Sequence, residues 1–210
     1  MTSSVILTAD PLPGALTAPS PSPTPLRLEF LGGESARLSD RIVPLRRRFC
    51  EILLILSLHP NGLNGGQLST ALYGEWADSQ NQTVEVHRLS KVIQLRNKPY
   101  RLMSVLSADF LDLQSLISAG RVQEACELYR GELLPHSDAP AVCEHREYLH
   151  EAMRHAVRLS RDLAPLWTFV SRFPDDLELL EALQARMPQD DVRCSLLSAR
   201  LTITRKKFNV

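Results

Sequence analysis

The stretch from Arg46 to Leu58, RRRFCEILLILSL, decides how the first half of the chain folds. Its apolar residues recur at helical spacing through Phe49, Ile52 and Leu56, which predicts an amphipathic helix over 46–58. The following residues 59–62, HPNG, supply the proline and glycine that end helices. The longest apolar run, residues 52–58, is far shorter than the ~20 residues that span a bilayer. We therefore expect no membrane segment.

Two more helices are predicted after this one. Asn64 with Gln67 three positions later forms a capping box, and Gly74 ends that short helix. Thr83 is predicted to cap a third helix that runs to about Leu95. The buried stripe of this third helix is predicted to consist of Val86, Leu89 and Ile93.

Extended segments lie on both sides of the three helices. Residues 26–30, LRLEF, alternate between apolar and polar, and short extended pieces follow the Gly32-Gly33 turn, so we expect a small antiparallel sheet of two or three strands. Residues 99–105, PYRLMSV, predict a strand or short hairpin. Residues 1–25 contain six prolines and are predicted to be a disordered lead-in. The order of small sheet, three helices and β-wing is that of a winged helix-turn-helix.

The chain is predicted to be helical from Asp109 onward. Helices are expected at about 110–118, 122–129, 142–163, 166–173 and 175–186, with a last one after Pro188. Helix pairs joined by short Gly and Pro turns suggest a helical-repeat scaffold. The sequence thus predicts a mainly α protein with a winged-helix domain at 26–108 and an all-α, TPR-like domain at 109–210. We expect the second domain to fold alone, its apolar stripes pairing with one another.

Composition and charge limit the classes of protein to which the chain is expected to belong. The 210 residues carry 24 basic and 24 acidic side chains, so the formal net charge is zero. The four cysteines show no Cys-x-x-Cys pair, and the N-terminus lacks the basic region of a secretory signal, so we expect a cytoplasmic protein. Charge is unevenly distributed, with nine basic against four acidic residues over 41–104 and nine against fifteen over 111–199.

The sequence shows few of the residue spacings that are typical of catalytic or metal-binding sites. The sequence has no Gly-x-Ser-x-Gly elbow and no phosphate-binding loop, so we do not expect an enzyme. Cys143, Glu147 and His150 share a helix face and could hold a metal, but a solvated helix flank explains them better. No metal and no organic cofactor is expected.

The basic residues of the third helix and the wing form a better candidate site. Helices that read DNA carry cationic or hydrogen-bonding side chains opposite their buried stripe. Arg88 and Lys91 meet this requirement and are the candidates for groove contact, with His87 and Gln94 beside them. A solvated basic helix would show a similar pattern. The residues expected to hold phosphate or the minor groove are Arg96, Lys98 and Arg101.

The three arginines at 46–48 form a second candidate site for contact with DNA. Cations at a helix N-terminus oppose the helix dipole, at a cost of a few tenths of a kcal/mol each. A DNA phosphate is one reason for them, and Arg46 and Arg48 are assigned to that role. The alternatives are that such arginines lie over the sheet or pair with Glu51.

These segments resemble the SARP-like family of bacterial transcription regulators. Residues 45–75, which contain ALYGE, are similar to the first two helices of the family's winged helix, and residues 83–93 with 96–102 resemble its recognition helix and wing. Residues 120–135, GRVQEACELYRGELLP, resemble the bacterial transcriptional activation domain, a TPR-related module. Ser90 stands where such helices often carry another basic residue. The sensor and ATPase domains common in the family have no counterpart in the matched segments.

The resemblance implies a bacterial, sequence-specific regulator that binds double-stranded promoter DNA. Its helical domain would mediate homodimerisation or contact RNA polymerase or a sensor protein. The alternative is a protein-interaction adaptor that does not bind DNA and works through the helical domain. The zero net charge and Ser90 favour the adaptor, whereas the basic residues over 88–101 and at 46–48 favour DNA binding.

Overall fold

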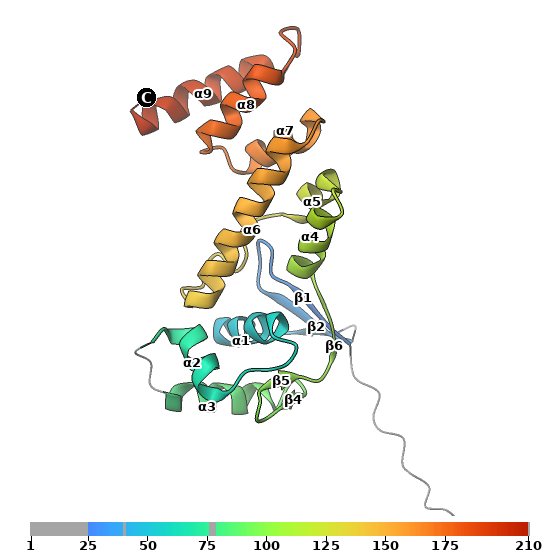
Figure 1. The fold of residues 1–210 in the computed structure, drawn as a ribbon, viewed down its shortest axis with the longest axis vertical. Helices are drawn as coiled ribbons and strands as arrows, with labels where there is room; N and C mark the ends of the chain where they lie inside the picture. The colour runs from blue at the N-terminus through green and yellow to red at the C-terminus, as the bar shows by residue number, and fades with distance from the viewer. Residues whose placement is uncertain (1–24, 40, 76–78, 210) are drawn as a thin grey trace, which may run out of the picture.

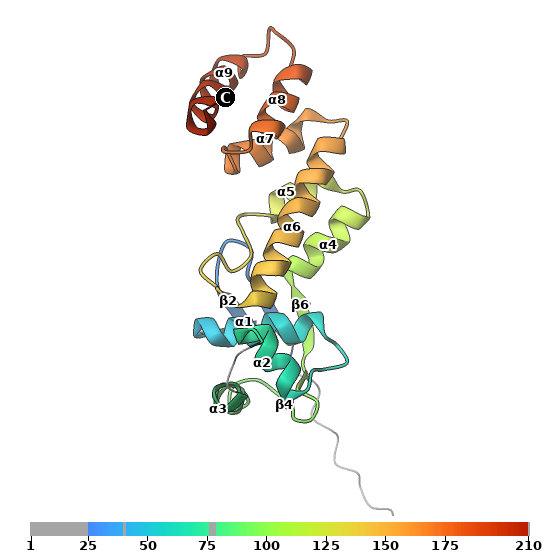
Figure 2. The same cartoon turned by 60° about the vertical axis from the view of Figure 1, so that its left-hand side comes forward.

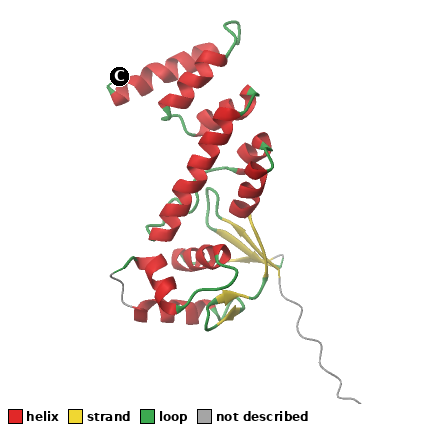
Figure 3. Cartoon of the chain, viewed as in Figure 1, coloured by secondary structure: helices red, strands yellow, loops and turns green. Residues whose placement is uncertain are grey.

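A computed structural model describes residues 25–39, 41–75 and 79–209, and the side chains of residues 79–81 are left out of the description. The predicted lead-in at 1–25 lies outside the described residues except for Pro25, which begins strand β1 (Pro25–Glu29). Most of the described residues are helical, with the strands gathered near the first helices (Figure 3). The expectation of a mainly α chain is confirmed.

The first sheet has four strands in the order β3-β2-β1-β6. β1, β2 (Ser35–Leu38) and β3 (Arg41–Val43) are antiparallel as predicted. The purely antiparallel expectation is wrong, because β6 (Val105–Ala108) pairs with β1 in parallel, with Leu26 opposite Leu106. The four residues of β6 are too few to show a clear strand pattern. The parallel pairing also joins segments about 80 residues apart in the sequence.

Three helices follow the first three strands. α1 (Arg47–Leu58) agrees with its prediction, and residues 49–56 are all buried. α2 (Gly65–Tyr73) begins with the predicted capping box, in which Gln67 N donates to Asn64 Oδ1 at 2.9 Å and Asn64 N donates to Gln67 Oε1 at 2.9 Å. It ends at Gly74, whose φ of +86° is easy for glycine and strained for other residues. α3 (Ser79–Leu89) completes the group.

The second half of the described chain is helical throughout. Its elements are α4 (Asp109–Ser118), α5 (Val122–Leu128), α6 (Pro140–Leu159), α7 (Leu163–Arg172), α8 (Leu177–Arg186) and α9 (Cys194–Phe208). The long helix predicted to reach residue 163 ends at Leu159, because Asp162 caps the next helix through its contact with Ala164 N at 3.0 Å. Figures 1 and 2 show α8 and α9 at the end of the molecule opposite to α3.

Among the described residues, none of the helices combines the length and the apolar character that crossing a membrane requires.

The two halves share one hydrophobic core, so the expectation that the stripes of 109–210 pair only with one another is wrong. The ring of Phe110 stacks on that of Phe30, with 6.2 Å between centroids. The Asp109 carboxylate accepts hydrogen bonds from Phe30 N at 3.0 Å and from Leu31 N at 2.9 Å. α6 also packs on α1 and α2. Side chains on both sides of residue 108 therefore exclude water together.

Two glycines allow these halves to touch. Gly32 N donates to Glu132 O at 2.9 Å, and Leu134 N donates to Phe30 O at 3.1 Å. A Cβ built on Gly131 would lie 2.9 Å from Gly32 Cα, which is closer than such atoms approach without a backbone shift. The β1–β2 turn and the loop after α5 are thus in contact through their backbones.

We expect Gly131→Ala to lower the free energy of unfolding by about 1–3 kcal/mol, because the new methyl group meets backbone rather than a movable side chain. Gly33→Ala is the matched control in the same turn, since a Cβ there has no neighbour within 4 Å. Its effect should stay within about 0.5 kcal/mol. Urea unfolding of both variants tests this, and equal stabilities would show that the two backbones can separate freely.

Candidate nucleic-acid interface

The apolar stripe predicted for the third helix is buried, and the other side of α3 is exposed. Val86, Leu89 and Ile93 are at most 2% exposed, whereas His87 and Arg88 are exposed. The prediction that Thr83 begins the helix is wrong, because α3 begins at Ser79. The polar residues 79–82 do not show an apolar period, so the sequence pattern begins later than the helix.

The C-terminal end of α3 also differs from its prediction. The helix ends at Leu89, so Lys91 and Gln94 lie in the turn that follows and not on the helix face. Lys91 N donates to Arg88 O and Val92 N donates to Leu89 O, a tightening of the last turn to i→i+3 bonds. The β-branched residues 92 and 93 favour extended backbone, and the chain has to enter a strand at Leu95. Lys91 and Gln94 remain exposed.

Arg88 is the basic residue on the exposed face of α3. Its side chain is 53% exposed, and its Nη1 lies 2.8 Å from Glu85 Oε1 one turn earlier. An exposed pair of this kind contributes about 0.2–1 kcal/mol, so the guanidinium can exchange Glu85 for another anion at low cost.

The arginines at the start of α1 have different environments. Arg46 is the exposed N-cap residue and makes no side-chain capping hydrogen bond. Arg48 is half-buried and paired within the chain: its Nη1 lies 2.7 Å from Glu51 Oε2, and its guanidinium carbon lies 4.6 Å from the centre of the Tyr73 ring. The predicted alternative of pairing with Glu51 therefore describes Arg48.

An open surface pocket of about 480 Å³ brings two of these segments together. It lies where the start of α1, the end of α2 and the exposed face of α3 meet. The residues that line it are Arg46, Arg48, Tyr73, Val84, Glu85 and Arg88. Three guanidinium groups thus border one depression on the surface, and an anion such as a phosphate is the ligand that their charge and hydrogen-bonding geometry suit.

The remaining candidate residues lie on a two-stranded hairpin. β4 (Leu95–Arg96) and β5 (Arg101–Leu102) are antiparallel, with Arg96 opposite Arg101. A hairpin is present as predicted, but its first strand, β4, lies before the predicted segment 99–105, in residues assigned to the end of the third helix and the turn after it. Arg96 and Lys98 are exposed, and Lys98 lies in the connecting turn. α3 and this hairpin lie at the same end of the molecule in two views (Figures 1 and 2).

Behind the pocket lies the buried carboxylate of Glu51, for which the sequence predicts only an arginine partner. Glu51 is 0% exposed, and its Oε1 accepts a hydrogen bond from Ser137 Oγ at 2.7 Å. Burial raises the pKa of Glu51, and this outweighs the opposing effects of Ser137 and Arg48. Glu51 is thus paired on both sides, with Arg48 of its own helix and with Ser137 of a loop 86 residues later, and the second partner is not visible in the sequence.

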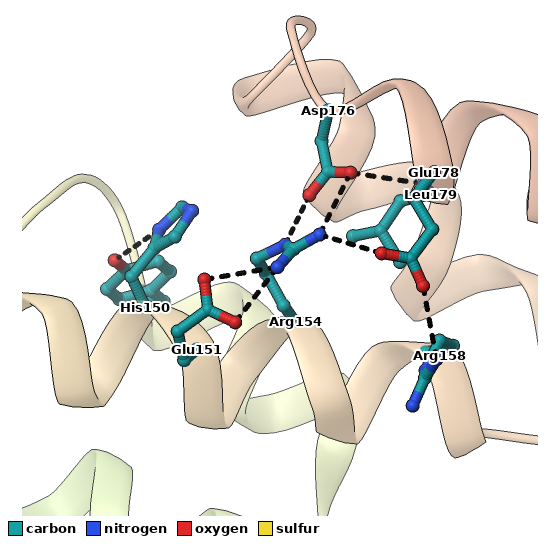
Figure 4. Close-up of polar contacts among 8 residues, drawn as sticks. His150, Glu151, Arg154, Arg158, Asp176, Glu178 and Leu179 are labelled. Atoms are coloured by element: carbon teal, nitrogen blue, oxygen red, sulfur yellow. Dashed lines mark hydrogen bonds and ion pairs between the residues drawn. The ribbon is translucent and has the colours of Figure 1, made fainter.

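A second polar cluster ties α6 to α8 (Figure 4). Arg154 contacts Asp176, Glu151 and Glu178, and the nearest of these is Asp176 Oδ2 at 2.5 Å. Asp176, and after it Glu151, raise the pKa of the arginine above its usual range. The charge of Arg154 is thus neutralised by its own chain, which favours a structural role over ligand binding. No local sequence pattern reveals this cluster, because it joins residues more than 20 positions apart.

Two of the three possible metal ligands of α6, Cys143 and His150, have other partners. Cys143 Sγ donates to Ser137 O at 3.6 Å, and His150 Nδ1 lies 3.1 Å from the hydroxyl of Tyr129. In the part of the chain that the structure describes, no three His, Cys, Asp or Glu residues form a group that could hold a metal ion.

No family model matches the sequence. The chain is 30% identical over 208 residues to a Rhodococcus erythropolis protein named "Uncharacterized 47.3 kDa protein in thcA 5'region". The match covers 95% of this chain and 46% of that protein, so the chain spans about half the length of the relative. The relative's name assigns no activity, and the function is therefore argued from the geometry of the interface.

We expect the raised pKa of Glu51 to appear in the pH dependence of stability. A carboxyl whose pKa is raised on folding contributes stability fully below its unfolded pKa of ~4.3 and loses it as pH rises through the folded value. Glu51→Gln removes this titration, so its stability relative to the parent protein should improve as pH rises above ~4.3 and level off once pH has passed the raised pKa of Glu51.

Ser137→Ala is a second variant for the same measurement, with the opposite expected effect on the pH dependence of stability. The hydrogen bond from Ser137 lowers the pKa of Glu51, so its removal should raise that pKa further and steepen the loss of stability with pH. Thermal unfolding at a series of pH values measures both effects. Parallel curves for all three proteins would contradict the role assigned to burial.

Proposed function

We propose that the protein is a bacterial, cytoplasmic transcription regulator that binds double-stranded DNA with sequence specificity. In this proposal residues 26–108 form a SARP-like winged helix, and residues 109–210 form a TPR-like domain. The helical domain serves for homodimerisation or for contact with RNA polymerase or a sensor protein.

One observation carries the proposal. Arg46, Arg48 and Arg88 come from the start of α1 and from α3 and border a single open pocket, and among the described residues the carboxylates that pair with them are Glu85 and the buried Glu51. A row of basic residues that converges on one depression is typical of phosphate contact. The order of three helices followed by a β-hairpin at the same end of the molecule supports a winged helix around this pocket.

The roles of the candidate residues follow from their places. Arg88 is the side chain on α3 that can reach a base edge, and a guanidinium bonds guanine bidentately. His87 lies next to it on the same exposed side. Since Lys91 and Gln94 lie in the turn after α3, we assign them to the DNA backbone together with the residues of the hairpin. Those hairpin residues are Arg96, Lys98 and Arg101.

The adaptor remains the second candidate, and one observation favours it. Arg48 and Arg88 each already have a carboxylate partner within the chain, Glu51 and Glu85. In an adaptor these pairs would simply stabilise the surface, and the helical half would bind the partner.

We expect affinity for duplex DNA to fall steeply with salt. The five cations between Arg88 and Arg101, if they replace phosphate counterions, predict a slope of log affinity against log salt on the order of −3 to −5. Fluorescence anisotropy with genomic fragments selected by the purified chain measures this slope. Absence of binding at ~50 mM salt, or binding that is insensitive to salt, would favour the adaptor.

Substitution of Arg88 separates base reading from backbone contact. Arg88→Ala should weaken binding to the selected site by about 1–3 kcal/mol and have a much smaller effect on random DNA, since a lost base contact erodes discrimination. Lys98→Ala should weaken both DNAs about equally and reduce the salt slope by roughly one unit. Glu85→Gln frees Arg88 from its ion pair and should strengthen binding to both.

Neither Arg88 nor Lys98 belongs to the buried stripe of α3, so folding should be unaffected. Equal losses of affinity on selected and random DNA for Arg88→Ala would show that α3 contacts only the backbone.

A further inference from the structure

The last helix, α9, is apolar on two sides. Leu197, Leu201 and Thr204 are buried, on the side where α9 packs against α8. A second set of apolar residues faces away from the core. This set, the outer stripe, consists of Leu196, Ala199 and Ile203, and its two large members are 65% and 60% exposed.

The spacing of the outer stripe is that of a helix-packing surface. Its members stand at positions i, i+3 and i+7, which lie on one face of an α-helix at about 100° per residue. Scattered single apolar residues are ordinary on protein surfaces, but an aligned set over two turns is the pattern by which one helix packs on another.

A small cavity of about 240 Å³ adjoins the stripe between α7, α8 and α9. Its lining is mostly apolar and includes Trp167, Val170, Leu180 and Leu196, so the stripe continues into it; the polar members of the lining are Ser171 and Arg200. A tryptophan at the border of such a cavity is typical of the centre of a protein interface.

The charged residues of α9 indicate which kind of partner can cover the outer stripe. α9 has no acidic residue from Cys194 to Phe208. Arg205 pairs with Glu181 at 2.8 Å and Lys207 with Asp175 at 2.7 Å. Arg200 and Lys206, by contrast, make no ion pair within the described residues. At about 100° per residue these two cations flank the outer stripe on opposite sides.

We propose that the outer stripe of α9 docks an amphipathic helix of a partner protein, with apolar residues over the stripe and Asp or Glu residues on both of its borders. An apolar side chain of the partner enters the cavity beside Trp167, and carboxylates meet Arg200 and Lys206. A second copy of α9 fits worse, because it would bring basic residues against basic residues. This inference concerns the end of the molecule away from α3 and does not depend on DNA binding.

Two peptides test the proposal with the whole chain. Both are helical 18-residue sequences with leucine at i, i+3 and i+7, one with glutamate and one with lysine along the borders of the leucines. At ~50 mM salt we expect the glutamate peptide to bind about tenfold more tightly in fluorescence anisotropy. The difference should shrink as salt rises, because the pairs are exposed to solvent.

Variants on α9 locate the binding site. Ile203→Gln should weaken the glutamate peptide about tenfold, and Ser198→Gln, exposed on another side of the same helix, should leave it unchanged. Ile203 is mostly exposed, so neither change should shift the melting temperature by more than a few degrees. The double substitution Arg200→Glu with Lys206→Glu should reverse the preference in favour of the lysine peptide.

Three outcomes overturn the proposal. Equal affinity for the two peptides would remove the argument from charge, and affinity unaffected by Ile203→Gln would place binding elsewhere. Sedimentation that shows a dimer of the parent chain, dissociated by Ile203→Gln, would assign the stripe to a second copy instead. Failure of the chain to bind DNA leaves all three measurements interpretable.

Discussion

The backbone contact between Gly32 and Gly131 fixes how the two halves of the chain meet. The hydrogen bonds from Gly32 N to Glu132 O and from Leu134 N to Phe30 O join a β-turn to a loop about 100 residues later. Arg146 then holds that loop to α6 by donating to Leu133 O at 2.7 Å and to Ser137 O at 2.8 Å. The direction of α6, and of every helix after it, depends on this junction.

A buried charge connects the junction to the basic surface. Glu51 lies between Arg48, which borders the pocket, and Ser137, which belongs to the loop held by Arg146. A carboxylate in an apolar helix costs several kcal/mol of desolvation unless it is well paired, and replacing such a pair by apolar residues is often neutral or stabilising. The presence of Glu51 in α1 is therefore better explained by the residues that it positions than by a gain in stability. It keeps Arg48 directed toward the pocket and keeps the loop in register with α1.

The sequence was sufficient wherever a pattern is local. The spacing of α1, the Asn64 capping box and the stripe of α3 were all predicted from neighbouring residues, and the structure confirms them. The parallel pairing of β6 with β1 was missed because its partner lies far along the chain. The early end of α3 was missed for a different reason: the stripe residue Ile93 continues the helical period beyond Leu89, although its backbone has left the helix.

The same limit applies to the site. Basic residues could be read from the sequence, but which of them share a pocket could not, because Arg46 and Arg88 are brought together by the packing of α1 and α3. The division into two domains at residue 108 was a prediction from composition and pattern. The buried side chains cross that boundary, and a composition change does not reveal such contacts.

The arrangement of the two proposed surfaces limits how they can influence each other. α3 lies at one end of the molecule and α9 at the other, with the 20-residue α6, about 30 Å long, between them (Figure 1). A partner on α9 would therefore not block DNA at the pocket. If both surfaces bind as proposed, they act together by holding the partner near the DNA and raising its effective concentration there.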